Sequence, residues 1–148
     1  MSLEQIFSLS TKLSMIGWLG LVLAPRWSIT RDWFAPVIAP LMIGCLYIWL
    51  IASNFSLAPD GAEFGSLAGV ITLFSVPELV LVGWIHYLAF DLFVGAWEVK
   101  DAQKEGIHHL VLIPSLLATL MAGPVGLVLF WVVKLSYRAA RSPAAGEV

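Results

Sequence analysis

Charged residues divide the chain into four long apolar runs separated by short polar stretches. The hydrocarbon core of a bilayer is about 30 Å thick, and roughly 20 apolar helical residues cross it. On that scale the pattern predicts an all-α integral membrane protein with four transmembrane helices. Their approximate ranges are 3–24, 35–53, 76–98 and 110–135. We expect residues 1–136 to form a single transmembrane domain and residues 137–148 to form a polar, disordered tail.

A shorter apolar segment lies between the second and third runs. Residues 61–74 would reach only about 21 Å as a helix, which is too short for a complete crossing. This segment is therefore predicted to be a short re-entrant or interfacial helix. Gly61, Gly65 and Gly69 recur at every fourth position and would let another helix approach closely. The sequence therefore allows a homo-oligomer that forms through this glycine face.

The start of the third run carries a helix-capping signal. Ser75 and Glu78 have the spacing of a capping box, in which each side chain bonds the backbone N–H of the other residue. Pro77 stands between them, and proline is tolerated in a first helical turn. The third span should therefore begin near residue 76, and the capping box alone would explain a glutamate there.

The fourth run is interrupted by Gly123-Pro124. Proline has no N–H group, so the carbonyl of Leu120 loses its usual helical partner. The run is predicted to form one kinked span across the interruption. An unpaired carbonyl at membrane depth needs a donor, and Thr119 or a bound hydroxyl could supply one.

The composition agrees with a protein whose solvent is mostly lipid. Hydrophobic residues make up 59% of the chain and charged residues 12%, with a mean hydropathy of +0.89. Soluble domains carry about 25% charged residues, so a soluble enzyme is excluded. The net charge of −2 and the scattered Lys and Arg residues argue against disorder and against nucleic acid as a partner. A single cysteine, Cys45, allows no internal disulfide.

The positive charges leave the orientation of a four-span protein undecided. Four of them would flank one membrane face and three the other, which nearly balances the bias that orients membrane proteins. The first set is Arg26, Arg31, Lys100 and Lys104, and the second is Lys134, Arg138 and Arg141. Neither a cleavable signal peptide nor a transit peptide is recognised, which favours the inner membrane of a bacterium.

Ionisable residues concentrate in the third span. On a helical wheel of about 100° per residue, Asp91, Glu98 and Asp101 share one side, and His86 lies at its edge. This acidic side should face protein or water rather than lipid. His86 and Asp91 lie deepest in the apolar run, so they are candidates for acid/base or ligand-binding work, although a buried polar pair could also serve only helix packing. Glu78 is the third catalytic candidate.

Glu98 and Asp101 also open the polar connection that follows the third span. Lysines stand beside them there, and the simpler expectation is that both carboxylates are solvated. No cofactor is predicted, because the histidines lack the spacing of a helical metal-binding pair. The weaker alternative is a zinc or non-haem iron site. Its ligands would be His86, Asp91, Glu98, His108 and His109.

The third span and its flanks resemble one known family. The quoted segments are Leu73 to Glu78, Gly83 to Gly95, Asp101 to His108, Pro114 and Gly123 to Gly126. They are similar to the abscisic-acid-deficient membrane protein family, and the resemblance covers nearly the whole chain. Plant members of that family are needed to make neoxanthin from violaxanthin. The resemblance therefore implies a four-span membrane protein of carotenoid metabolism.

The resemblance also implies a particular chemistry. Neoxanthin formation opens an epoxide and creates an allene, so an acid must protonate oxygen and a base must remove a carbon-bound proton. A protonated Asp91 or Glu78 would be the acid and neutral His86 the base, or the roles could be exchanged. The residues expected to line a carotenoid-like substrate are Trp84, Tyr87, Phe90, Trp97, Thr119 and Leu120.

Three functions stay open on the sequence. The first is an epoxy-carotenoid isomerase, the second a non-catalytic accessory protein that binds a carotenoid or isoprenoid lipid, and the third a metal-dependent membrane enzyme. The expected partners are membrane lipid, a hydrophobic carotenoid-like ligand, and either a second copy of the chain or other enzymes of the carotenoid pathway. Turnover distinguishes the first from the second, and metal content tests the third.

Overall fold

The computed structural model describes residues 1–141, and within that range all regular structure is helical. Residues 137–141, expected to begin the tail, continue the last helix, and the rest of the predicted tail lies outside the described residues. The helices are α1 (Leu3–Leu23), the π-helical segment η1 (Ile29–Ile38), α2 (Ala39–Asn54), the 3₁₀ turn η2 (Phe55–Leu57), α3 (Leu67–Leu73), α4 (Pro77–Glu105), α5 (His109–Ala122) and α6 (Pro124–Arg141).

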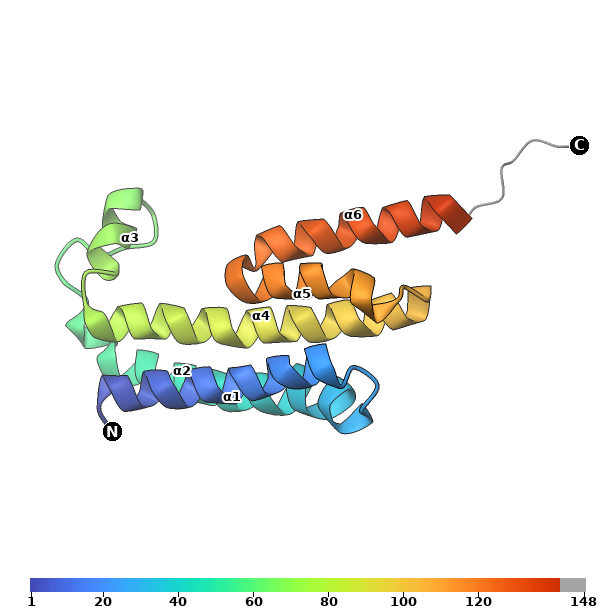
Figure 1. Cartoon of the computed structure of the whole chain (residues 1–148). Coiled ribbons are helices and arrows are strands. Elements are labelled where there is room, and N and C mark those ends of the chain that lie inside the picture. The colour runs from blue at the N-terminus through green and yellow to red at the C-terminus, as the bar shows by residue number, and fades with distance from the viewer. Residues whose placement is uncertain (142–148) are drawn as a thin grey trace, which may run out of the picture.

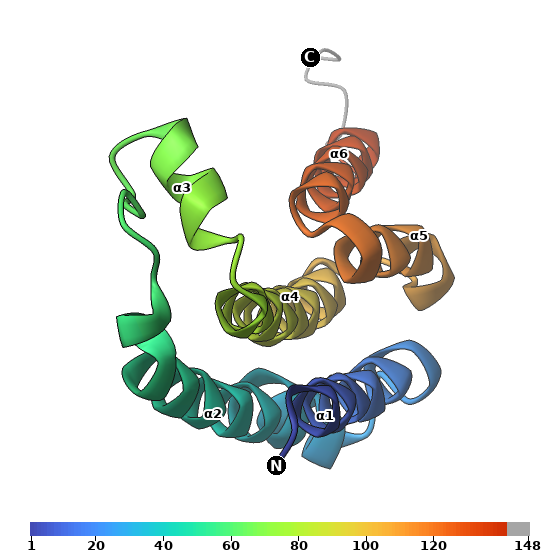
Figure 2. The same ribbon diagram turned by 90° about the vertical axis from the view of Figure 1, so that its left-hand side faces the viewer.

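The long helix α4 lies at the centre of the molecule. Figure 2 shows α1 and α2 on one side of α4 and α5 and α6 on another, with α3 standing apart from the other helices. Glycines bring α1 and α4 close together, since Gly17 faces Leu92 and Gly95 faces the ring of Trp18. Leu92 and Trp18 are buried, and burial of such side chains stabilises a contact by about 2 kcal/mol each.

Three helical stretches are long and apolar enough to span a membrane. They are Leu3–Leu23, Ile29–Leu57 and Pro77–Glu105. The first agrees with the prediction to within a residue. The second begins at Ile29 rather than at residue 35, because η1 and α2 run on without a break. Pro36 and Pro40 withhold two backbone N–H groups near this junction, and wider π turns carry the chain past them.

The helix α4 continues through the segment that we expected to be a polar connection. Good helix formers fill that segment, and Gly106, with a φ of 71°, ends the helix in the left-handed conformation. The predicted capping box at the other end does not form. Val76 precedes the helix without a side-chain cap, and the Ser75 hydroxyl instead donates to the Thr72 carbonyl at 2.7 Å.

A helical hairpin replaces the single kinked span predicted for residues 110–135. The helix α5 ends at Ala122, and α6 starts at Pro124 and runs back along it (Figure 1). The two helices pack closely because Gly126 has no side chain where it meets Thr119. At fourteen residues α5 is about 21 Å long, which is too short to cross the hydrocarbon core.

Ion pairs hold the returning helix α6 against α4. The amine of Lys134 is 2.5 Å from the Asp101 carboxylate and 3.5 Å from that of Glu105, and Arg138 also pairs with Glu105. Lys134 is only 5% exposed, so its charge is neutralised inside the helix packing. Asp101 was expected to be solvated, and this expectation is wrong because the hairpin brings a lysine to it from α6.

The segment 61–74 is helical only over α3. Gly61 has a φ of 84° in a turn, and Gly65 lies in the loop before Ser66, whose hydroxyl caps α3 by accepting the Gly69 N–H at 3.1 Å. Gly69 packs against Glu63 of the same loop. The three glycines therefore do not share a helical face, and the surface expected to receive a second copy of the chain is not formed by them.

The close contact between α5 and α6 can be tested with one methyl group. In Gly126→Ala the new Cβ would overlap atoms of Thr119, and overpacking of this kind destabilises by about 1–3 kcal/mol. We expect the free energy of unfolding in detergent to fall by about 2 kcal/mol. The matched control is Gly44→Ala, where no atom lies within 4 Å of the added Cβ. The control should be neutral or slightly stabilising, and equal losses in both variants would contradict the close packing.

Candidate functional site

The acidic side of α4 faces the α5–α6 hairpin. Each of its three carboxylates meets a different part of the hairpin. Asp91, Glu98 and Asp101 lie, in that order, against Gly123 at the turn, Thr119 of α5 and Lys134 of α6. These contacts agree with the prediction that the acidic side faces protein or water.

The reversal between α5 and α6 leaves backbone groups without a helical hydrogen-bond partner. Side chains of α4 lie against these groups. Pro124 has no N–H to offer to the carbonyl of Leu120. The hydroxyl of Tyr87 donates to that carbonyl at 2.6 Å. The carboxyl group of Asp91 lies beside the N–H of Gly123 and the hydroxyl of Tyr87. A side chain at Gly123 would occupy the same space, since its Cβ would stand 2.5 Å from Oδ1 of Asp91.

Glu98 is completely buried between α4 and α5. Its two carboxyl oxygens lie 2.9 and 3.1 Å from the Thr119 hydroxyl, which is also 3.0 Å from the Ser115 carbonyl. One hydroxyl proton can serve only one acceptor at a time. A carboxyl group with so little compensation is costly to bury when it is charged. The expectation that Glu98 is solvated is wrong, because α4 continues past it into the packed hairpin.

Two buried polar atoms in this region have no hydrogen-bond partner within residues 1–141. They are Oδ2 of Asp91 and the hydroxyl oxygen of Ser115. Folded proteins leave few such atoms, so each one calls for an explanation in terms of strain or function. We define the carboxyl site as Tyr87, Asp91 and Glu98 of α4 together with Ser115 and Thr119 of α5. It can exchange protons and bind hydroxyl groups inside an apolar helical protein.

His86 lies on a different face of α4 from the carboxyl site. Its exposed ring stacks on Phe90 with centroids 4.5 Å apart and lies 5.8 Å from the ring of Tyr47 in α2. Asp91 follows five residues later, which is about 140° further around the helix. The structure therefore does not join His86 and Asp91 in one pocket as an acid/base pair.

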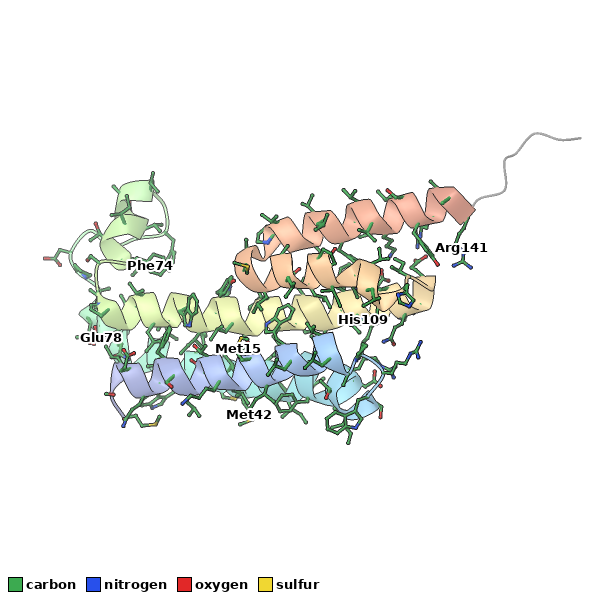
Figure 3. The ribbon with its side chains drawn as sticks, viewed as in Figure 1. Met15, Met42, Phe74, Glu78, His109 and Arg141 are labelled. Carbon is green, nitrogen blue, oxygen red and sulfur yellow. The ribbon has the colours of Figure 1, made fainter. Side chains whose placement is uncertain are left out.

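The remaining ionisable candidates lie towards the two ends of the molecule. Figure 3 shows Glu78 at one end and His109 at the other. Glu78 stands about 20 Å before Asp91 along α4. Nε2 of His109 lies 2.9 Å from the Val22 carbonyl, and His108 caps α5. The five residues considered for a metal are not brought together, and residues 1–141 contain no group of three or more His, Cys, Asp or Glu side chains that could hold one.

Three of the aromatic residues predicted to line a substrate lie in different surroundings. Trp84 stacks on Phe7 of α1 with centroids 5.5 Å apart. Phe90 is 58% exposed on the outer surface of α4. Trp97 packs edge-on against Phe130 of α6 at 5.2 Å, within the helix packing. Of the three, Trp84 is beside the carboxyl site, since its ring lies 5.3 Å from that of Tyr87.

The other three predicted residues, Tyr87, Thr119 and Leu120, do meet at the carboxyl site. Thr119 was offered as a partner for the Leu120 carbonyl, but Tyr87 takes that place and Thr119 bonds to Glu98. The sequence reasoning missed Ser115 and placed Glu98 in solvent. The position of Glu98 on the acidic side of the helical wheel could have indicated its burial. The position of Ser115 depends on how α5 is rotated against α4, and no sequence pattern indicates that rotation.

Two apolar clefts lie on the side of α4 that carries His86. One, of about 370 Å³, lies between α4 and the proline-rich junction of η1 and α2, and Phe90 forms part of its lining. The other, of about 310 Å³, lies beneath α3 and is lined in part by His86, Tyr47 and Phe74. The stacked rings of His86 and Phe90 stand between the two clefts.

These features define a class of protein. Within residues 1–141 it is all-helical, has three helices long and apolar enough to span a membrane, and encloses two carboxyl groups beneath a helical hairpin. The family model described as ABA4-like, ABA DEFICIENT 4-like, matches residues 5–130, so the chain belongs to the ABA4-like family.

One curated relative illustrates the match. The chain is 25% identical over 139 residues to "Protein ABA DEFICIENT 4, chloroplastic" from Arabidopsis thaliana. The matched region is 88% of this chain and 61% of that protein, so this chain spans less than two thirds of its relative. No solved structure matches the chain.

The hydrogen bond from Tyr87 to the hairpin can be tested by removing one oxygen atom. Tyr87→Phe leaves the buried Leu120 carbonyl without a donor, which costs about 1–3 kcal/mol. We expect the free energy of unfolding to fall within that range and amide exchange at the end of α5 to accelerate. In the control Tyr47→Phe, the hydroxyl removed bonds to no residue of the described chain, so both quantities should stay unchanged. Equal behaviour of the two variants would show that the bond does not hold the hairpin.

Proposed function

We propose that this chain is a membrane-embedded protein of carotenoid metabolism that isomerises an epoxy-carotenoid, as in the synthesis of neoxanthin. Membership of the ABA4-like family and the three long apolar helices support this proposal. The observation that carries it is the buried Oδ2 of Asp91, which has no hydrogen-bond partner in the described chain. A carboxyl oxygen kept from water and from other donors is suited to exchange a proton with an apolar substrate.

The carboxyl site has an edge that a lipid-dissolved substrate could reach. Tyr87 is half-buried, and Trp84 beside it is exposed. A carotenoid dissolves in the hydrocarbon, so its end group would arrive from lipid rather than from water. The ring faces of Trp84 and Tyr87 would then flank the reacting carbons and stabilise positive charge that develops there.

A single carboxyl group can carry the whole isomerisation. Asp91 in its acid form donates a proton to the epoxide oxygen as one C–O bond breaks, which leaves a hydroxyl on one carbon and positive charge on the other. The polyene carbon bonded to that second carbon loses its proton to the Asp91 carboxylate, and the C–H electron pair completes the allene. Substrate and product have the same composition, and the acid is regenerated. Exclusion of water protects the cation from hydrolysis.

The isomerase proposal predicts that Asp91→Asn abolishes conversion. Bacteria that make an epoxy-carotenoid would express the full chain, and chromatography with mass spectrometry would detect an isomer of unchanged mass. The matched control is Asp60→Asn, in an exposed turn, which should retain conversion. Full conversion by Asp91→Asn at equal protein level would overturn the assignment. His86→Ala separates two mechanisms, since it retains activity if Asp91 acts alone and loses it if His86 is the base.

A second candidate is a carotenoid-binding accessory protein without turnover. The observation that favours it is the pair of apolar clefts on the His86 side of α4, about 370 and 310 Å³ in volume, which meet at stacked aromatic rings. This function predicts that pigment co-purifies unchanged with the wild-type chain and with Asp91→Asn. Enlarging Gly44, which lines the first cleft, to Leu should then reduce the bound pigment.

We also propose an orientation in the membrane. The hairpin returns α6 to the end of the molecule where α5 begins, and Figure 3 shows His109 and Arg141 at that end. Seven of the eight Lys and Arg residues gather there: Arg26, Arg31, Lys100, Lys104, Lys134, Arg138 and Arg141. Loops rich in Lys and Arg stay on the side where the chain is synthesised, so this end would be cytoplasmic in a bacterial plasma membrane.

Cysteine labelling tests the number of crossings and the orientation together. In a Cys45→Ala background, cysteines replacing Lys104 and Ala140 should react from the cytoplasmic side, and one replacing Asp60 from the opposite side. All three positions are exposed and lie outside the helix packing. Four crossings would instead place Ala140 on the same side as Asp60, and that result would contradict the hairpin topology.

A further inference from the structure

The charged end of the molecule contains a cleft that is separate from the carboxyl site. It has a volume of about 1180 Å³ and lies where the end of α1, the connection between α4 and α5, and Tyr137 of α6 meet. No Asp or Glu is among the residues that line it. The lining side chains that carry or can carry positive charge are Arg26, Arg31, His108 and His109.

Hydrogen bonds between segments far apart in the sequence hold the walls of this cleft. Gln103 accepts from Arg31 at 3.0 Å and donates to the Pro25 carbonyl at 2.8 Å. His109 lies with Nε2 2.9 Å from the Val22 carbonyl, and only an N–H can bond a carbonyl, so Nε2 is the donor. The walls are thus built into the fold before any ligand arrives.

The two arginines that line the cleft differ in whether their guanidinium N–H groups are available to a ligand. Arg31 is committed, since its guanidinium lies 2.6 Å from Asp32 and also bonds to Gln103. Arg26 makes no hydrogen bond or ion pair with any of residues 1–141. His108 accepts a backbone N–H through Nδ1, which leaves Nε2 as its donor. The helix dipole of α5, which begins at this wall, adds to the positive potential.

We propose that this cleft binds a phosphate group, that of an anionic phospholipid headgroup, with Arg26 and His108 as its donors. A guanidinium presents parallel N–H groups that match two phosphate oxygens. The rim favours a lipid as the source of the phosphate, because Leu23, Trp27 and Leu110 are strongly exposed there and can meet glycerol and acyl chains. The cleft exceeds the roughly 300–1000 Å³ of most small-molecule sites, so a headgroup with the start of its chains has room.

Lipid retention by the full chain tests this proposal. The protein would be purified in detergent, titrated with phosphatidylglycerol or with zwitterionic phosphatidylcholine, and examined by native mass spectrometry. We expect the wild type to retain phosphatidylglycerol in preference, and Arg26→Gln to bind it about tenfold more weakly, as the loss of one charge-assisted contact predicts. His108→Gln should weaken it less, and the double variant most.

The control removes the same charge from the same end of the molecule. Lys104 is exposed but does not line the cleft, so Lys104→Gln should bind phosphatidylglycerol as the wild type does. Unfolding temperatures of Arg26→Gln, Lys104→Gln and the wild type without lipid should agree, because Arg26 has no partner to lose within residues 1–141. A second arm adds inorganic phosphate. Stabilisation by phosphate that depends on Arg26, without a preference for phosphatidylglycerol, would support the phosphate site and assign it to a soluble ligand.

Two results would overturn the proposal. One is a wild-type chain that shows neither a preference for phosphatidylglycerol nor stabilisation by phosphate. The other is an equal loss in Arg26→Gln and Lys104→Gln, because the attraction would then be that of a charged surface rather than of a site. Neither readout involves carotenoids, so failure here and failure of the isomerase proposal are distinguishable.

Discussion

Everything around the carboxyl site depends on one reversal of the chain inside apolar surroundings, at Gly123-Pro124. A helix that ends away from water must find partners for its last backbone groups. Here the hydroxyl of Tyr87 donates a hydrogen bond to the Leu120 carbonyl, and the carboxyl group of Asp91 lies beside the Gly123 N–H. The turn and the carboxyl site therefore adjoin. Oδ2 of Asp91 is buried there without a hydrogen-bond partner in the described chain.

The same reversal decides where the charges lie. With one kinked span, α6 would end on the far side of the molecule and its three cations would stand alone. Folded back, Lys134 and Arg138 reach the carboxylates at the end of α4, and the basic residues collect at one end. This collection supports both the proposed membrane orientation and the proposed phosphate site, whose cleft lies where α1, α4, α5 and α6 converge.

The periodicity of the sequence correctly predicted those features that depend on one helix alone. The first span, the apolar part of α4, the acidic side of that helix and the unpaired Leu120 carbonyl all follow from spacing of 3.6 residues per turn or from the missing N–H of proline. What it could not supply is the relation between helices. A Gly-Pro pair permits both a kink and a reversal, and the choice depends on tertiary contacts such as Gly126 against Thr119 and Lys134 against Asp101.

His86 shows that two ionisable residues in one apolar span need not lie in the same site. It stands about 140° around the helix from Asp91, and stacking on Phe90 makes it part of an aromatic surface beside two apolar clefts. In the proposed isomerisation, one carboxyl group can protonate the epoxide oxygen and then remove the proton from the neighbouring polyene carbon, so no imidazole base is needed. The two proposals therefore assign different faces of α4 to different tasks, the clefts beside His86 to an apolar ligand and the carboxyl site to proton exchange.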